Sequence, residues 1–160
     1  MSVLDGLVLE NPCLFRARLS GRFLDERAYG CHGGIDLTYR NKADGLYLRP
    51  ALAGTLDFAG EDKKTGLGRY IRMRHEWNGL LLFTWYCHLE AIYLPPGDWD
   101  TQVMLGIAGA TGNVFPAGPA GRHLHFALQV PFHGRAGCGI PSVVDPLPFF
   151  SADTIAEWTK

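Results

Sequence analysis

The histidine pair His123 and His125 is the feature of this sequence that most directly suggests chemistry. In a β-strand, side chains two residues apart lie on the same face, so both imidazoles point to one side while Leu124 and Phe126 point to the other. Two adjacent imidazoles pack poorly in an apolar core, but they form one corner of a good metal site. Exposed strand histidines are common, so this pair alone leaves a surface role open.

A second candidate group is the segment 32–36, with the sequence HGGID. It brings His32 and Asp36 together across a turn that two glycines make flexible. Imidazole and carboxylate both bind zinc, and catalytic zinc usually has three protein ligands and a water. The alternative is that Asp36 caps a turn and His32 lies on the surface. His88 directly follows an apolar segment, so it is expected at the end of a strand, where it could belong to an active site. The alternative is a structural role, as a buried histidine that is hydrogen-bonded to a backbone carbonyl.

β-Strands must position these candidates, because strand patterns dominate the sequence. Residues 69–76 alternate polar and apolar side chains, which predicts a half-exposed strand. Residues 80–88 are almost continuously apolar, which predicts a strand buried on both faces. Further strands are predicted at 51–59, 103–107 and 123–130, a turn at 61–64 and a loop at 108–122. A helix is predicted at 151–160, with Ser151 or Asp153 as its N-cap.

The fold class follows from these elements and from 20 glycines and 10 prolines, which suit short strands joined by turns. We predict a mainly β protein built on one twisted antiparallel sheet or a β-sandwich-like pair of sheets. Long loops and a short C-terminal helix complete it. A length of 160 residues predicts a single domain over 1–160.

Composition limits the partners. The 15 basic and 16 acidic residues create no overall field for a polyanion, so nucleic acid is not expected as a partner. The cluster Arg69, Arg72 and Arg74 is interpreted as a solvated strand face. No apolar run reaches the roughly 18–20 residues of a membrane span. Polar residues near the start of the chain also argue against a signal peptide.

The four cysteines, Cys13, Cys31, Cys87 and Cys138, show no C-x-x-C spacing and do not indicate a zinc knuckle. Free thiols in a reducing compartment are predicted, with two disulfides as the alternative. Cys31 and Cys87 each precede a candidate site histidine. Strand alternation predicts that both point away from a metal there, and no bridge is expected.

Taken in order along the chain, the motifs form a set: H-x-x-x-D at 32–36, WYCHL at 85–89, GATG at 109–112 and HLHF at 123–126. This set resembles the lysostaphin or LytM-type zinc metalloendopeptidases, which cut peptide bonds within bacterial cell-wall peptidoglycan. The segments SGRF at 20–23, AGTL at 53–56 and VDP at 144–146 are similar to further parts of that family. The resemblance covers roughly residues 20–150.

The resemblance implies a role for each candidate. His32, Asp36 and His125 match the zinc ligands, while His88 and His123 match the two catalytic histidines that do not bind zinc. The expected activity is that of a hydrolase, an endopeptidase or lysin that cuts peptidoglycan peptides with a zinc-activated water. The alternatives are a non-catalytic peptidoglycan-binding or regulatory domain, and a zinc amide hydrolase acting on a different peptide.

Four departures from the family pattern bear on substrate preference, and one of them is an expanded turn at 98–101. The loop 113–122 is longer than usual, Arg122 replaces a common proline, and Ala127 replaces a frequent glutamate. All five candidate positions remain intact. Action at the cell wall implies export or delivery by a phage or another machine, and otherwise the protein is cytoplasmic as made. His75 matches a position that is often histidine in the family, but a structural role is expected, and His133 is expected on the surface.

Overall fold

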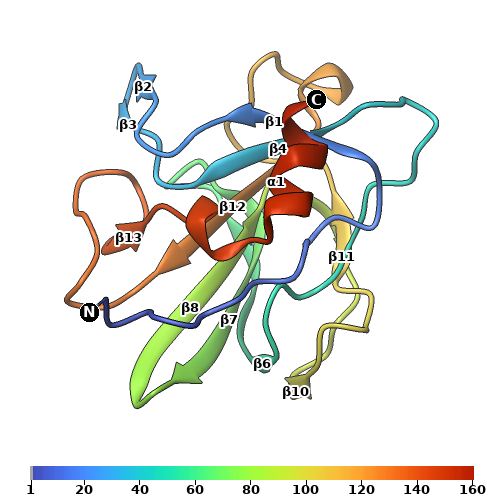
Figure 1. Cartoon of the computed structure of the whole chain (residues 1–160). Coiled ribbons are helices and arrows are strands. Elements are labelled where there is room, and N and C mark those ends of the chain that lie inside the picture. Colours follow the sequence, from blue (N-terminus) through green and yellow to red (C-terminus); the bar gives the residue numbers. More distant parts are fainter. Residues whose placement is uncertain (1) are drawn as a thin grey trace.

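The computed structural model describes residues 2–160, and its main feature is one strongly twisted antiparallel sheet (Figure 1). The strand order is β1-β4-β12-β8-β7-β6-β10, with β13 paired to β12. These strands are β1 (Ala17–Gly21), β4 (Ile35–Tyr39), β6 (Gly54–Asp62), β7 (Gly68–Trp77), β8 (Leu80–Cys87), β10 (Asp98–Trp99), β12 (Leu124–Gln129) and β13 (Val143–Val144). The mainly β prediction is confirmed.

Smaller elements flank this sheet. A three-stranded sheet joins β5 (Tyr47–Leu48), β11 (Gly106–Ala108) and β9 (Leu89–Ile92), and a separate hairpin joins β2 (Glu26–Arg27) to β3 (Gly30–Cys31). Two short 3-10 turns, η1 (Pro119–Gly121) and η2 (Leu147–Phe149), precede β12 and the C-terminal helix. The helix is α1 (Ala152–Thr159), and the Ser151 hydroxyl caps it by accepting the Thr154 N–H at 3.1 Å.

The hairpin of β7 and β8 follows directly from its sequence. Asn78 and Gly79 both have positive φ, at 49° and 78°, as a two-residue hairpin turn requires. Ile71, Met73 and His75 are buried on one side of β7, as the period of two predicts. β8 differs from its prediction in its first half, because Leu81 is 45% exposed and Leu80 and Phe83 are only partly buried, whereas Leu82 and all residues from Thr84 onward are buried.

Other strand bounds differ more. β6 begins at Gly54 rather than residue 51 and continues to Asp62, through the first half of the turn predicted at 61–64. β11 begins at Gly106, three residues later than the strand predicted at 103–107. The strands β1 and β4 have no counterpart among the predicted elements. Their contacts with neighbouring strands, rather than local pattern, make them strands.

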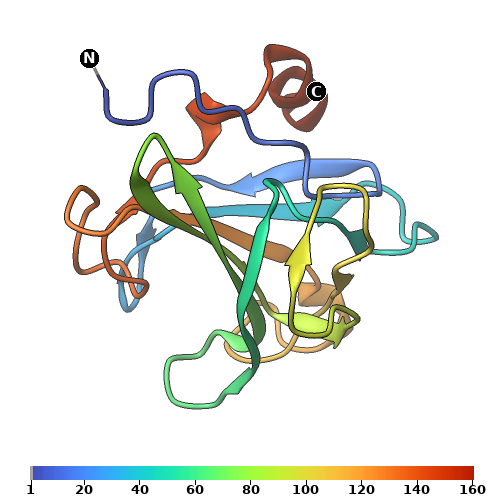
Figure 2. The same cartoon turned by 90° about the horizontal axis from the view of Figure 1, so that it is seen from below.

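The main core lies on one face of the sheet. Ile35, Leu37, Tyr86, Leu124 and Phe126 are completely buried there. The α1 helix and the N-terminal segment lie on this side of β1 and β4 (Figure 2). Trp158 of α1 packs edge-on against Phe150, which in turn meets Phe126. The helix therefore closes the core under the centre of the sheet.

A second, smaller cluster lies on the opposite face and corrects the prediction for the cysteines. Trp85, Cys87 and Ala127 pack there against Cys138, Ile140 and Val143. Cys31 and Cys138 form a disulfide, with Cα atoms 4.8 Å apart, although 107 residues separate them in sequence. Spacing along the chain cannot show such an approach. Cys13 and Cys87 are free and buried.

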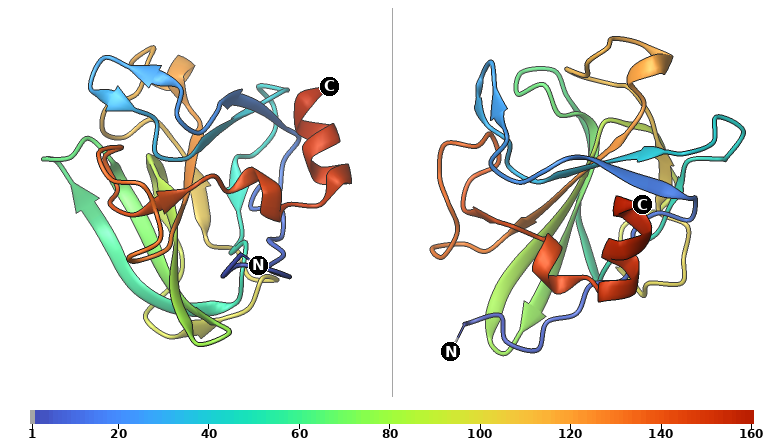
Figure 3. Two further views of the ribbon diagram at one scale, coloured as in Figure 1. Left: turned by 60° about the vertical axis from the view of Figure 1, so that its left-hand side comes forward. Right: turned by 45° about the horizontal axis from the view of Figure 1, so that its top comes forward.

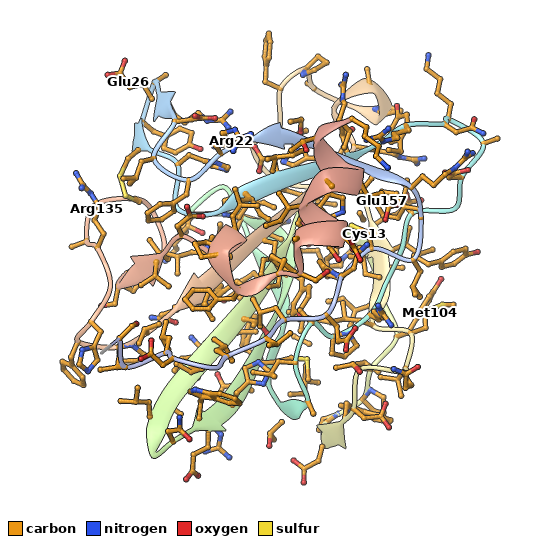
Figure 4. All side chains as sticks on the ribbon, in the orientation of Figure 1. Cys13, Arg22, Glu26, Met104, Arg135 and Glu157 are labelled. Atoms are coloured by element: carbon orange, nitrogen blue, oxygen red, sulfur yellow. A yellow bond between two sulfur atoms is a disulfide. The ribbon has the colours of Figure 1, made fainter. Side chains whose placement is uncertain are left out.

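The disulfide joins the β2–β3 hairpin to the loop 131–142. Both views of Figure 3 show these two segments on the same side of the sheet. In Figure 4 Glu26 marks the hairpin and Arg135 marks the loop, while Cys13 lies apart from both, beside the helix residue Glu157. Within residues 2–160, no helix is long and apolar enough to cross a membrane.

Candidate metal centre

Three side chains converge on one point at the sheet face opposite the main core. β12 pairs with β4 so that His125 lies opposite Asp36, and both therefore face the same side. His32 Nε2 lies 2.9 Å from His125 Nδ1, and Asp36 Oδ1 lies 3.0 Å from each of these nitrogens. Tetrahedral zinc separates its ligand atoms by roughly 3.3 Å. The three atoms therefore fit one zinc ion with a small outward adjustment.

His32 reaches this point from the bend between β3 and β4. Its Nδ1 donates to the Arg22 carbonyl at 2.7 Å, which leaves the Nε2 lone pair free for a metal. Gly34 follows in the bend, and any side chain there would collide with the Phe126 carbonyl. Glycine is thus required for β4 to approach β12 closely enough to bring His32 to His125.

The charges at this point suit a cation. Burial opposes ionisation of Asp36, but hydrogen bonds with His125 and His32 outweigh it and hold the Asp36 pKa well below its usual range. Burial lowers the pKa of His125, against the opposing effect of Asp36. An ionised carboxylate beside neutral imidazole is the protonation state that a metal ligand set needs.

His88 lies on the metal side because of its backbone. β8 ends at Cys87, one residue before the predicted end, and His88 has a left-handed φ of 63°, which is uncommon for a residue other than glycine. Regular alternation would direct His88 toward the core with Tyr86. Instead, Cys87 pairs with His125 and His88 also lines the groove at the metal centre. The prediction that Cys87 points away is therefore wrong, although it contributes no ligand atom.

His88 and His123 present the same ring edge to the site. His88 Nδ1 donates to the Thr111 carbonyl and His123 Nδ1 to the Gly121 carbonyl, each at 2.8 Å. The two ring centroids are 4.8 Å apart, and His123 Nε2 lies 3.6 Å from Asp36 Oδ1. Both rings can therefore exchange a proton only at Nε2.

Burial, assisted by His123 and His125, lowers the pKa of His88 to about 3. His88 is therefore neutral near pH 7. Its Nε2 then carries a free lone pair, because Nδ1 holds the proton.

Arg27 belongs to the site, although the sequence assigned it no role beyond a segment at 25–27 that resembles the family. Its Nη2 donates to Asp36 Oδ2 at 3.0 Å, so Asp36 offers one oxygen to the metal position and the other to a guanidinium. Arg27 comes from the β2–β3 hairpin. An arginine in a short hairpin carries no sequence signal of this contact, because the hairpin's position depends on the tertiary fold.

Two grooves meet at the metal centre. One, of about 560 Å³, extends past His123 toward β1 and contains Arg18, Arg27 and Arg122. The other, of about 370 Å³, extends past His88 toward the disulfide. His88, His125, Tyr29 and Asn113 line both grooves. An extended ligand that occupied both grooves would therefore pass across the metal position.

The structure places the remaining candidates away from the site. His75 is buried between the Ala53 carbonyl and the Thr84 hydroxyl, a structural position as expected. His133 is exposed on the loop 131–142. Arg72 is half-buried and Arg74 is exposed on one face of β7, as predicted, whereas Arg69 lies on the other face and donates to the Glu90 carbonyl.

Several solved structures that match this chain are named as peptidases. A putative glycyl-glycine endopeptidase LytM from Ruminococcus gnavus matches 89% of this chain and 59% of its own, with a TM-score of 0.66 and 21% identity. The antimicrobial peptidase lysostaphin from Staphylococcus simulans matches 84% of this chain and 49% of its own, with a TM-score of 0.65 and 22% identity. A zinc-containing peptidase from Vibrio cholerae matches 88% of this chain and 40% of its own, with a TM-score of 0.62 and 22% identity.

The chain therefore has the fold of the LytM and lysostaphin peptidase domains, and the resemblance read from its motifs is confirmed at the level of the fold. It spans less than two thirds of the length of each of these three proteins. No protein-family profile matches the sequence, and a search of curated proteins finds no match.

Proposed function

We propose that this chain, which has the lysostaphin fold, is a zinc-dependent endopeptidase that hydrolyses peptide bonds in bacterial peptidoglycan. The observation that carries the proposal is the convergence of His32, Asp36 and His125 within about 3 Å, beside two more histidines that expose Nε2. A purely structural cluster would not need five such groups around one groove. The motif resemblance and the names of the similar structures support the peptide substrate and zinc.

In this proposal His32 Nε2, Asp36 Oδ1 and His125 Nδ1 hold the zinc. When bound, zinc supplies an acidified water and polarises a carbonyl group. Arg27 fixes the second oxygen of Asp36, and the Arg22 carbonyl fixes the tautomer of His32. Both contacts hold the ligand atoms in place before the metal arrives.

The catalytic roles of His88 and His123 follow from their shared tautomer. Because each Nδ1–H is committed to a carbonyl, a neutral ring accepts a proton at Nε2, and only an imidazolium donates from it. His88 is neutral and its Nε2 lone pair is free, so we assign His88 to accept the proton of the attacking water. His123, whose side chain is 15% exposed, is assigned to donate to the oxyanion or the leaving amine.

A digest of purified peptidoglycans with different cross-bridges, analysed by mass spectrometry, tests this function. New fragments should appear with the zinc-loaded protein, disappear with a chelator and return when zinc is restored. Zinc-loaded His88→Ala protein is the matched control and should release almost none. If the zinc-loaded wild type cleaves no peptidoglycan, a non-catalytic binding role or a substrate outside the cell wall replaces the proposal.

A further inference from the structure

Arg18 lies on the same face of the sheet as the metal centre, at the edge strand β1. The register pairs Arg18 with Thr38 of β4, which is two residues beyond Asp36 and therefore faces the same way. The Thr38 hydroxyl donates to the Arg122 carbonyl at 3.3 Å, next to His123. With strands about 4.8 Å apart, Arg18 stands about 10 Å across the sheet from His123.

The groove that Arg18 borders has an excess of positive charge. Three arginines line it, Arg18, Arg27 and Arg122, against the single carboxylate of Asp36. Asp36 is already bonded to Arg27. Arg122 pairs with Glu90 at 3.0 Å, but the two side chains are 40% and 51% exposed, so this pair is weak and open to exchange. In the described part of the chain, Arg18 is exposed and has no acidic partner.

The groove on the other side of the metal centre differs in character. None of its lining residues is Asp, Glu, Lys or Arg. Gly33, Gly66 and Gly139 form part of its wall, together with Leu67 and Ile140. Such a wall suits a small uncharged group, whereas the arginine-lined groove suits an anion. A peptide that crosses the site is therefore recognised differently at its two ends.

From this asymmetry we propose that Arg18 and Arg122 form a carboxylate-binding subsite beside the metal centre. The substrate peptide then carries a carboxylate on the β1 side of the scissile bond and a small uncharged residue on the other side. The planar guanidinium fork matches a carboxylate in two hydrogen bonds. The inference rests on the proposed function, because it names the substrate class of the same site.

The carboxylate can belong to an acidic side chain or to the C-terminus of the peptide, and small probes separate these sources. The 160-residue chain, loaded with zinc, is titrated by NMR with N-acetylglutamic acid α-amide, N-acetylglutamine amide and N-acetylglycine. A carboxylate probe should shift the Arg18 guanidinium signal and bind about fivefold more tightly than the glutamine amide, the size expected for a partly exposed ion pair. The glutamate probe tests a side-chain carboxylate and N-acetylglycine a terminal one.

Two charge-matched variants decide whether Arg18 is responsible. Arg18→Gln should remove the preference for the carboxylate probe. Arg16→Gln removes the same charge two residues earlier, from a side chain that is 68% exposed and does not line this groove, and should retain the preference. Equal binding of the carboxylate and amide probes overturns the subsite. Carboxylate binding that is unchanged in Arg18→Gln also overturns it, because the anion then sits on the zinc.

These titrations require no hydrolysis, so their result is separate from that of the peptidoglycan digest. Cleavage by a protein with no carboxylate preference refutes the subsite and leaves the proposed function in place. Carboxylate binding at Arg18 by a protein that cleaves nothing supports the subsite and refutes the catalytic role.

Discussion

His75 on β7 and His125 on β12 are two buried histidines of the same sheet, and they differ in what surrounds them. Their exposed fractions are similar, 4% and 8%, and burial lowers the pKa of both. At His75, Nδ1 donates to the Ala53 carbonyl and Nε2 accepts from the Thr84 hydroxyl, each at 2.8 Å. Both nitrogens are used, so His75 has no lone pair left for a metal.

At His125, by contrast, Nδ1 faces a second imidazole nitrogen and a carboxylate oxygen within 3.0 Å. Two imidazole nitrogens this close gain little from each other without a cation between them. Burial therefore keeps an imidazole neutral in both places, but only the convergence of several lone pairs with Asp36 creates a metal site.

Among the variants that test this difference between His75 and His125, removal of a metal ligand should have the largest effect. In Asp36→Ala or His125→Ala, we expect zinc affinity to fall by more than about 100-fold and activity to disappear, because two ligands cannot replace three. Metal content after dialysis, measured by mass spectrometry, checks this. His75→Leu is the matched control and should keep one zinc per chain. Stoichiometric zinc in either ligand variant would contradict the assignment.

His88→Ala separates catalysis from metal binding. We expect turnover to fall by about 100- to 10,000-fold, the usual contribution of a general base, while zinc content stays that of the wild type. Rates on the peptide released most readily in the digest provide the measurement. Near-normal turnover in a zinc-loaded variant would remove His88 from the mechanism.

Arg27→Gln tests whether the carboxylate needs its second partner. The variant loses the ion pair to Asp36 Oδ2 but keeps all three ligand atoms. We expect zinc affinity to weaken by about 10- to 100-fold, as for other residues that orient a ligand. Competition with a chromophoric chelator measures the affinity without reference to activity. An unchanged dissociation constant would show that Asp36 holds the metal without a second partner.

His75→Leu should change only the stability of the fold, and we expect its effect to be the smallest of the four. The change leaves the Ala53 carbonyl and the Thr84 hydroxyl without their partner, which we expect to cost about 1–3 kcal/mol of unfolding free energy. Zinc content and turnover should match the wild type. Denaturant unfolding provides the measurement, and a loss of zinc in this variant would mean that the two histidine environments are coupled.

The same variant gives a pH test with a definite sign. Burial lowers the pKa of folded His75, whereas the unfolded side chain protonates near about 6.5. Acid therefore favours the unfolded state, and this residue's contribution to stability declines below pH ~6.5, by up to about 1.4 kcal/mol per pH unit. The stability gap between wild type and His75→Leu should narrow from pH 7 to pH 5. A gap that widens would refute the neutral, buried state of His75.

Much of the fold could be read from local patterns. The alternation along β7, the apolar run of β8, the face shared by His123 and His125, and the Ser151 cap all depend on residues within one element. Strand and helix geometry determine which way such side chains point. By contrast, β1 and β4 were not predicted, since these short strands of mixed sequence form through the pairing of β1 with β4 and of β4 with β12.

The sequence alone determined which residue types were available to bind a metal and that His123 and His125 would share a face. Only the tertiary structure decided that His32 would meet His125, because the pairing of β4 with β12 brings together two residues that are 93 positions apart in the sequence. It also decided the Arg27–Asp36 pair, the Cys31–Cys138 bridge and the turn of His88 toward the site. Each of these depends on segments far apart in the chain or on a backbone conformation that the surrounding packing imposes, and no local pattern encodes either.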